Sequence, residues 1–384
     1  MNVVLISPHF PPQFFLFAVA LKERGVNVLG LADAPHHELR PELRDALAEY
    51  YATNVEDLDQ ARRAMGWFIW KRGRIDRIDS HNEHWLGLEA QLREDFNVEG
   101  PRPAEMHRRR TKSGMAGLFR KADVPCPPGE LVQSDDQVRA FARAHGYPLV
   151  FKPDLGVGAA RTFKVTSAAE LDAVLAQPLS GYIVQPFIEG TIVSYDGLVT
   201  RDGRIVFETS HVYSGGIMEV VTGKLDVYYW NRREIPRALR TLGQRVVDGF
   251  GIRERFFHVE FFERPDGSYC ALEVNIRPPG GFTTDMMNYS ADIDVYRLWA
   301  RMLTGDPLTD FTYERKYHVA HVARRRGRSY RLSHEELVQR LGDRLLVFRD
   351  VPEVLAGAMG DQMYLIRDPD LGRLTEAIAD IQAS

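Results

Sequence analysis

The sequence predicts an α/β protein with more than one domain, and three observations support that prediction. NVVLIS, from Asn2 to Ser7, indicates a buried strand, PPQFFLFAVALKERG indicates a helix that ends at Gly25, and NVLGLAD indicates a second strand. This strand–helix–strand order is typical of an open parallel sheet. A second alternation of strands and helices follows residue 101. With 384 residues, the chain is long enough for two or three domains.

Composition narrows the class of protein. Hydrophobic residues make up 44% and charged residues 27%, as in ordinary soluble domains. The net charge of -4 gives no reason to expect a nucleic acid as partner. Two cysteines, Cys126 and Cys270, imply no disulfide framework and fit a reducing cytoplasm. The first residues do not resemble a signal peptide, and the apolar stretch FFLFAVAL is too short to span a bilayer, so we expect a cytoplasmic protein without membrane contact.

The first segment, to about Gly100, is predicted to be one α/β domain. Its first turn, SPHFPPQ, lacks the G-x-G-x-x-G pattern, which argues against a dinucleotide site and a Rossmann oxidoreductase. IDRIDSHNE, from Ile75 to Glu83, indicates a further strand with a polar end, and WLGLEAQLRE indicates the helix after it.

The middle of the chain contains a glycine-bearing loop between two strands. Prolines near Pro101 and Pro125 are expected to bracket one helix, on which Lys112 lies. YPLVFKPDLGVGAARTFKV then indicates strand, loop and strand, and Ser167 is a plausible N-cap of the next helix. The tail after Asp306 indicates a strand, a helix, a hairpin-like stretch and a last helix.

The strongest motif is a predicted β-hairpin near the end of the second half. Asp266–Gly267 indicates a two-residue turn, which would set Glu260 opposite Glu273 and His258 opposite Asn275. A symmetric four-residue loop would keep this register, and an odd loop would shift it by one residue. Alternation puts these polar residues on one face of the hairpin. The other face is apolar and consists of Phe257, Val259, Phe261, Leu272, Val274 and Ile276.

Two carboxylates that face each other across a hairpin predict a bound cation. Their Cβ atoms are expected about 5 Å apart, where like charges repel. Carboxylate oxygens together with the Asn275 amide suit Mg²⁺, and Mg²⁺ with few carboxylates usually shares its shell with nucleotide phosphates. The alternative is that Glu260 and Glu273 are solvated on an exposed sheet face or paired with arginines.

A phosphate site is predicted where an apolar strand ends at Lys152. The loop after it holds Gly156 and Gly158, and glycines let backbone N–H groups approach phosphate oxygens. Lys112 is a second candidate cation, although a solvated helix lysine is the alternative. The segment from Tyr182 to Gly190 is either a hinge whose backbone binds adenine or an ordinary turn.

Taken in order, these motifs resemble the ATP-grasp superfamily, in its carboxylate–amine ligase and biotin-carboxylase-like branch. The resemblance covers residues 1–300 approximately, and FHVEFFERPDGSYCALEVNIRPPGG is its most specific part. It implies an ATP-grasp fold with a Rossmann-like pre-ATP-grasp domain at 1–100, a lid subdomain at 101–185, a catalytic subdomain at 186–305 and a small C-terminal subdomain at 306–384.

The resemblance also implies roles for individual residues. Lys112 and Lys152 would grip ATP phosphates, and Arg277 would lie near the γ-phosphate and an acyl phosphate. Mg²⁺, or Mn²⁺ in its place, would bind Glu260, Glu273 and Asn275. The backbone that would hold adenine consists of Gln185, Pro186, Phe187 and Ile188.

Three positions depart from the family pattern. The phosphate loop, DLGVGAAR, has fewer glycines and no serine, and Gln185–Pro186 stands where the family often has two charged residues. Thr191 and Ile192 stand near the usual ribose-binding acid, for which Glu189 is the local candidate. These departures bear on nucleotide affinity and choice.

The substrate side is less specific. Ser210–Lys224 is predicted to be a loop whose His211, Tyr213 and Gly215–Gly216 either shape an acceptor pocket or belong to a mobile surface. For His258 we expect either a contact with substrate or water, or a structural hydrogen bond to Asn275. The remaining candidates are Asp196, which would face the site or be an ordinary strand acid, and Gly280 and Gly281, which would donate N–H groups to an anion or form a tight turn.

Two arginine-rich runs need separate interpretation. The segment from Ala323 to Arg331 is predicted to be a solvated edge strand rather than a nucleic-acid site. The run HRRR before Lys112 is predicted to contribute a positive field near ATP.

The expected function is that of an ATP- and Mg²⁺-dependent ligase. It would activate a small carboxylate, such as an amino acid, as an acyl phosphate and couple it to an amine, with release of ADP and phosphate. Bicarbonate activation and an ATP-binding module without turnover are the alternatives. The partners are then small molecules; homodimers are common in this branch, but the residues do not fix the oligomeric state.

Overall fold

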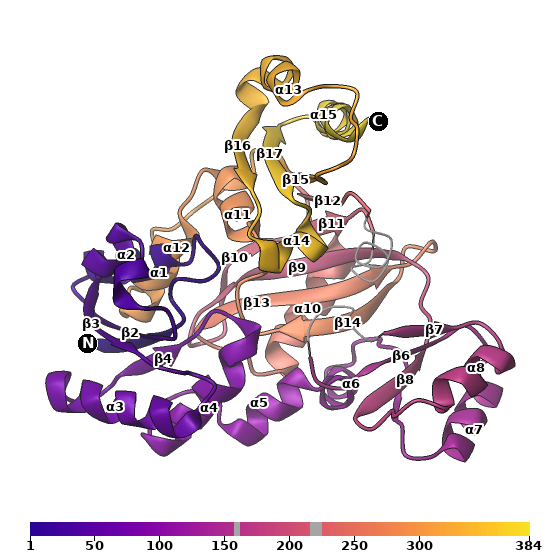
Figure 1. The fold of residues 1–384 in the computed structure, drawn as a ribbon, viewed down its shortest axis with the longest axis horizontal. Helices are drawn as coiled ribbons and strands as arrows, with labels where there is room; N and C mark the ends of the chain where they lie inside the picture. Colours follow the sequence, from indigo (N-terminus) through magenta and orange to yellow (C-terminus); the bar gives the residue numbers. More distant parts are fainter. Residues whose placement is uncertain (157–161, 216–224) are drawn as a thin grey trace.

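A computed structural model describes residues 1–156, 162–215 and 225–384. Three sheets organise this part of the chain, two of four strands and one of nine (Figure 1). The mixture of sheets and covering helices confirms the predicted fold class. None of the described helices is long and apolar enough to cross a lipid bilayer.

The N-terminal sheet is parallel, with strand order β3-β2-β1-β4. Alternate residues of β1 face opposite ways, so Val3 and Leu5 pack with α1 and α2 while Val4 and Ile6 pack with α3 and α4. The elements are β1 (Asn2–Ile6), α1 (Phe15–Glu23), β2 (Asn27–Ala32), η1 (His36–Glu38), α2 (Pro41–Ala46), β3 (Leu47–Ala52), α3 (Leu58–Arg72), β4 (Arg77–Asp79), η2 (Glu83–Trp85) and α4 (Leu86–Asp95).

A small antiparallel sheet of order β5-β8-β6-β7 carries two helices on one face. Its strands are β5 (Glu130–Leu131), β6 (Leu149–Pro153), β7 (Phe163–Val165) and β8 (Tyr182–Pro186), and its helices are α7 (Asp135–His145) and α8 (Ala168–Leu175). The predicted N-cap is confirmed, because the Ser167 side chain accepts a hydrogen bond from the Glu170 N–H.

The largest sheet runs through the second half of the chain in the order β14-β13-β9-β11-β12-β15-β17-β16, with β10 paired to β9. The strands after residue 306 continue this sheet toward the top of Figure 1. Its strands are β9 (Thr191–Val199), β10 (Ile205–Thr209), β11 (His211–Tyr213), β12 (Tyr228–Asn231), β13 (Arg255–Glu263), β14 (Tyr269–Asn275), β15 (His318–Arg324), β16 (Leu345–Asp350) and β17 (Gln362–Asp368). The helices of this half are α10 (Arg237–Gly249), α11 (Thr283–Ala291), α12 (Val295–Leu303), α13 (His334–Leu341), η3 (Gly342–Arg344), α14 (Glu353–Met359) and α15 (Leu371–Gln382).

One predicted strand is wrong. The run from Ala323 to Arg331 is not an edge strand, because β15 ends at Arg324 and lies between β12 and β17. Several of its arginines pair locally, as Arg326 does with Asp350 at 2.8 Å.

The single helix expected before Pro125 is in fact two helices, α5 (Pro103–Arg110) and α6 (Lys112–Lys121). Thr111 between them is extended and bridges to Leu155. The Lys112 N–H donates to the Asp154 carbonyl at 2.9 Å, and the Ser113 N–H and hydroxyl both donate to the Asp154 carboxylate. Because of these contacts a new helix, α6, begins at Lys112, which therefore lies beside the small sheet.

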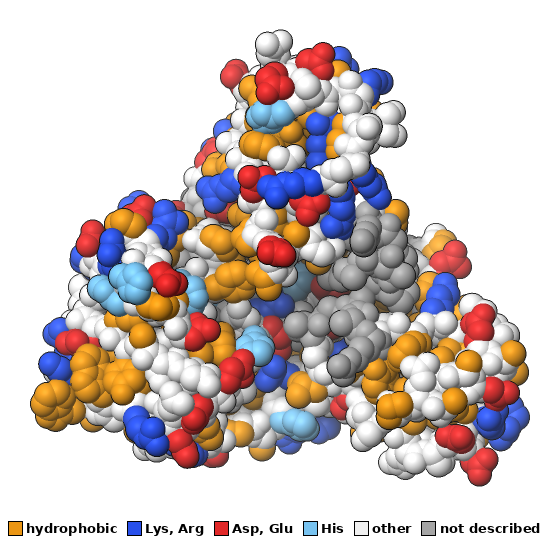
Figure 2. Space-filling view, in the orientation of Figure 1, with side chains coloured by type: hydrophobic (Ala, Val, Ile, Leu, Met, Phe, Trp, Pro, Cys, Tyr) orange, Lys and Arg blue, Asp and Glu red, His pale blue; other side chains and the backbone are white. Residues whose placement is uncertain are grey.

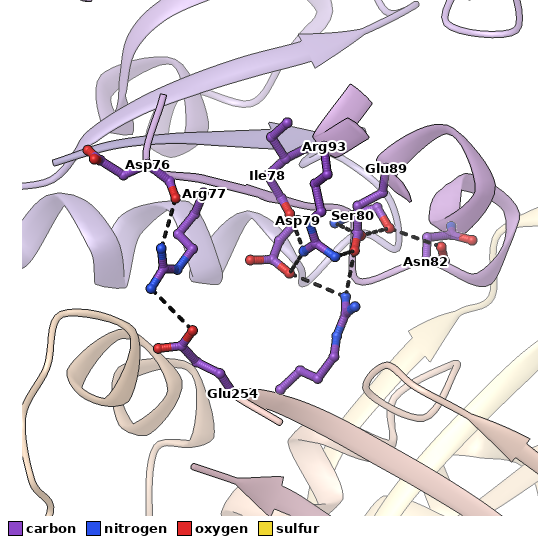
Figure 3. A network of polar contacts seen from close by, with 10 residues as sticks. Asp76, Arg77, Ile78, Asp79, Ser80, Asn82, Glu89, Arg93 and Glu254 are labelled. Atoms are coloured by element: carbon purple, nitrogen blue, oxygen red, sulfur yellow. Dashed lines mark hydrogen bonds and ion pairs between the residues drawn. The ribbon is translucent and has the colours of Figure 1, made fainter. Parts of the chain in front are cut away.

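A buried network of charges joins the N-terminal domain to the large sheet (Figure 3). Arg255 of β13 reaches Asp79 at 3.3 Å and Glu89 at 2.9 Å. Arg93 of α4 reaches the same two carboxylates, and all four side chains are almost completely buried. Figure 3 shows Arg77 alongside, turned toward Glu254. The first strand of the β13–β14 ribbon is thereby fixed to the N-terminal domain.

Candidate active site

The β13–β14 ribbon pairs Glu260 with Glu273 and His258 with Asn275, which is the predicted register. The predicted two-residue turn is wrong, because Glu263 pairs with Tyr269 and leaves a five-residue loop between them. The five-residue loop shifts the register by one residue, and a bulge between Glu260 and Phe261 shifts it back, so the predicted pairs still form.

The bulge also changes which face Leu272 occupies. Leu272 was expected in the core with Val274 and Ile276, and both of these residues do lie in a core cluster. Leu272 instead lines the same cavity as Glu273. The extra residue in β14 reverses the alternation at this one position.

A cavity of about 640 Å³ lies between the ribbon and the small sheet. It collects most of the predicted nucleotide and metal residues in one place. These are Lys112, Lys152, Gly156, Gln185, Pro186, Phe187, Ile188, Glu260, Glu273, Asn275 and Arg277. Glu189, Tyr213 and Gly215 also line it, whereas Gly158 and Gly216 lie outside the described residues.

Two lysines give this cavity its positive side. Lys152 is partly buried, and burial together with the charge of Lys112 lowers the pKa of Lys152 to about 8. The Lys112 ammonium donates to the Gly156 carbonyl at 3.1 Å, so it lies at the glycine-bearing loop. The two cations can hold an anionic ligand between the loop and the ribbon.

The facing carboxylates give the cavity its negative side. Burial and then the charge of Glu260 raise the pKa of Glu273, so the pair favours an added cation. No cluster of three or more His, Cys, Asp and Glu side chains suited to a metal occurs among the described residues. An ion here would therefore have two carboxylates and the Asn275 oxygen, a hard donor set that fits Mg²⁺ completed by phosphate oxygens.

His258 connects the acid pair to the interior of the sheet. Its Nδ1 lies 2.5 Å from Asp196 Oδ1 and its Nε2 lies 3.0 Å from Glu260 Oε1, so its partner is not Asn275. Burial lowers the pKa of His258, but Asp196 and Glu260 outweigh it and raise the pKa to about 9. His258 is therefore an imidazolium that donates to both carboxylates and fixes the orientation of Glu260.

The segment that begins at Ser210 was predicted to be a loop, and this is wrong for His211 and Tyr213. They form β11, which pairs with β9 and β12. His211 and Asp196 are fully buried, and the His211 Nδ1 lies 2.7 Å from Asp196 Oδ2. Burial would raise the pKa of Asp196, but the two histidines lower it to about 2. Asp196 and His211 thus lie beneath the cavity, and Tyr213 lies at its wall.

Glu83 is a site residue that the sequence analysis missed. The strand predicted to reach it ends at Asp79, and Glu83 begins a short 3₁₀ turn. Its carboxylate lies 3.6 Å from the Arg277 Nε and 2.9 Å from the Arg110 Nε. β4 is next to β1, where connections in a parallel sheet change direction, and ligand-binding loops favour that position. The polar end of IDRIDSHNE was the available signal.

The glycines after the ribbon form a tight turn. Gly281 has a φ of +61°, and its carbonyl accepts a hydrogen bond from the Gln13 side chain. The Gly280 carbonyl accepts from the Thr283 hydroxyl at 2.8 Å. A Cβ on Gly281 would lie 2.0 Å from the terminal methyl of Met359, a flexible side chain that can shift, so it is the positive φ that favours glycine here. The turn brings the N-terminal and C-terminal parts of the chain together behind Arg277. Figure 2 shows a hollow at the centre of this face, with basic, acidic and histidine side chains around it.

The residues given above for the charged cavity all fall within the part of the chain that matches a known family model. Residues 111–281 match the ATP-grasp domain. This middle part of the chain is therefore an ATP-grasp domain.

Solved structures resemble the chain over almost its whole length. L-amino acid ligase from Bacillus licheniformis is 17% identical, with a TM-score of 0.76 and coverage of 99% of this chain and 96% of that one. N5-carboxyaminoimidazole ribonucleotide synthetase from Thermotoga maritima is 15% identical, with a TM-score of 0.71 and coverage of 99% and 97%. The biotin carboxylase domain dimer of Hydrogenobacter thermophilus 2-oxoglutarate carboxylase, with MgADP and bicarbonate, is 14% identical, with a TM-score of 0.67 and coverage of 98% and 89%. These likenesses establish the fold.

Proposed function

We propose that the protein is an ADP-forming ligase that activates a small carboxylate with ATP and joins it to an amine. The observation that carries this proposal is the pairing of Glu260 with Glu273 on one wall of a cavity whose other side holds Lys112 and Lys152. Opposed acids and lysines suit a metal-bound polyphosphate. MgATP bound here would supply the phosphoryl group and the charge neutralisation for its transfer.

The residues of the chain have separable roles in this proposal. Lys152 and Lys112 bind phosphate oxygens, and Glu260, Glu273 and Asn275 hold the metal. Arg277 stabilises negative charge on the carboxylate as it is activated. His258 is a positioning residue, because it orients Glu260 and is itself held by Asp196. The backbone of residues 185–188 borders the cavity and is the proposed adenine contact.

An amino acid is the proposed carboxylate substrate. Arg277 and Glu83 present opposite charges 3.6 Å apart beside the acid pair, which suits a molecule that carries both a carboxylate and an ammonium. The likeness to an L-amino acid ligase supports the same class. Bicarbonate is the second candidate, because a structurally similar carboxylase binds it with MgADP.

We further propose functional units at 1–100, 101–185, 186–305 and 306–384 within a cytoplasmic protein. The small sheet would act as the lid over the ribbon. The free cysteines Cys126 and Cys270 fit a reducing compartment.

The test is ADP release with ATP and Mg²⁺ across a panel of amino acids, with bicarbonate in parallel and mass spectrometry for new amides. We expect ADP and an amide product with at least one pair of amino acids. ADP formed with bicarbonate alone would favour the second candidate. ATP bound without ADP from any carboxylate would refute a ligase and leave an ATP-binding module.

A further inference from the structure

A second cavity, of about 310 Å³, lies between the N-terminal domain and the turn that precedes β13. No described residue lines both this cavity and the nucleotide cavity. Its wall is rich in guanidinium groups, contributed by Arg77, Arg93, Arg109, Arg201, Arg253 and Arg255. We call it the arginine cavity.

Carboxylates neutralise four of these arginines. Asp79 and Glu89 are shared between Arg93 and Arg255. Arg77 lies 3.3 Å from Glu254, and Arg201 pairs with Glu99. These pairs account for the acids closest to the guanidiniums.

The positive charges of Arg109 and Arg253 are only weakly paired with carboxylates. Among the described residues, Arg109 pairs with a carboxylate oxygen of Glu105 at 3.9 Å, and Arg253 pairs with one of Asp248 at 3.8 Å. The Arg109 side chain is only 13% exposed and otherwise donates to the Gly251 carbonyl at 3.5 Å. Burial lowers the pKa of Arg109; the charge of Glu105 opposes this shift, and the charges of nearby arginines add to it. A buried guanidinium in this state gains from an added anion.

Unused donors point to the same conclusion. The Arg255 side chain is 7% exposed, and its Nε and Nη1 have no hydrogen-bond partner among the described residues. The Arg93 side chain is 4% exposed, and its Nε also has none in that part of the chain. Buried donors normally have an acceptor, so the cavity wall offers N–H groups for one.

We propose that the arginine cavity binds a small anion that carries a phosphate or pyrophosphate group. Two weakly paired guanidiniums suit an anion with more than one negative charge, and the planar fork of arginine matches the spacing of phosphate oxygens. The cavity volume admits inorganic phosphate, pyrophosphate or a small phosphate ester. This site is separate from the proposed nucleotide site and does not depend on turnover.

The test is calorimetric titration of the full chain with pyrophosphate, without ATP or Mg²⁺. Arg109→Gln and Arg253→Gln should each weaken binding about tenfold or more. Arg108→Gln is the matched control, because Arg108 is exposed on the same helix and outside the cavity. Lys152→Met should retain binding, because Lys152 lines the other cavity. Arg253 lies at the exposed rim, so its substitution tests the site even if Arg109→Gln fails to fold.

Absence of binding by the wild-type chain, or binding lost in Lys152→Met and kept in Arg109→Gln and Arg253→Gln, would overturn the proposal. Parallel titrations with inorganic phosphate and glycerol 3-phosphate distinguish the source of the group. Tighter binding of the ester assigns the cavity to a phosphorylated metabolite, and equal binding assigns it to free phosphate.

Discussion

Glu273 is a partly buried acid whose partner across the ribbon is another acid. Its raised pKa expresses the free energy that burial and Glu260 add to its ionised form. A divalent cation removes that penalty, and the His258 imidazolium next to Glu260 removes only part of it. The protein should therefore be more stable with a divalent cation at this acid pair than without one.

Glu273→Ala should lower the rate of ADP formation about a thousandfold or more, because a metal ligand is lost. The melting temperature should stay the same or rise, since a buried repulsion disappears. Steady-state kinetics and thermal unfolding measure the two effects. Glu263→Ala is the control on the partner strand of the ribbon, because its carboxylate pairs with Arg232 outside the cavity. Normal ADP formation by Glu273→Ala would remove this residue from the metal site.

Lys152 should make nucleotide binding depend on pH. Its pKa of about 8 means that the ammonium is charged below that pH and loses its proton above it. ATP is anionic, so affinity should be highest below pH 8 and fall by up to about tenfold per pH unit above it. Binding titrations on both sides of this pH measure the effect.

Lys152→Arg should bind ATP with little pH dependence, because a guanidinium stays charged throughout the range. Lys152→Ala should raise the ATP requirement at every pH. If the affinity of the wild-type chain does not change across pH 8, Lys152 is not the group that binds phosphate.

At the level of elements, the break between α5 and α6 positions Lys112. An uninterrupted helix would carry Lys112 past the cavity, whereas the contacts of Thr111 and Asp154 restart the helix beside it. Asp154 supplies both a carbonyl and a carboxylate to the first turn of α6. Its position two residues after Lys152 ties both lysines to one loop.

Asp154→Ala should weaken ATP binding and lower the free energy of unfolding by about 1 kcal/mol, because the cap of α6 is lost. Ser134→Ala removes a comparable cap, that of α7, and should cost a similar free energy without a change in ATP affinity. Chemical denaturation and nucleotide titration separate the two effects. Equal ATP affinity in the two variants would mean that α6 does not need its cap to present Lys112.

At the level of the whole molecule, the buried charge network holds the N-terminal domain against the large sheet. Glu89 accepts hydrogen bonds from Ser80 and from Arg255, and it pairs with Arg93 at 2.8 Å. Burial raises the pKa of Glu89, but the two arginines outweigh it and lower the pKa. The stabilisation from this carboxylate is therefore present above its unfolded pKa and is lost as the pH falls through the folded one.

Glu89→Gln should lower the free energy of unfolding by roughly 3–5 kcal/mol, because it leaves two arginines buried with too little negative charge. Urea unfolding at neutral pH measures the loss. Asp172→Asn, which breaks an exposed pair with Arg139, should cost less than about 1 kcal/mol. A loss as small as that of the control would show that the domain contact does not rely on Glu89.

The sequence by itself determined the α/β class, the ribbon and the pairing of Glu260 with Glu273. These follow from local periodicity and turn chemistry, which depend on neighbouring residues. The predicted pairing is correct because two departures from the prediction cancel: the loop is longer, and a bulge before Glu273 restores the register. A shift of one residue moves a side chain to the other face, as Leu272 demonstrates.

Tertiary structure alone decided which distant charges meet. Glu83 is beside Arg277, His258 is between Asp196 and Glu260, and Arg109 faces the arginine cavity instead of the nucleotide. Each pairing joins residues from separate elements, and no local pattern encodes the distance between them. Electrostatic energy depends on separation and burial, and both are set only when the sheets and domains pack together.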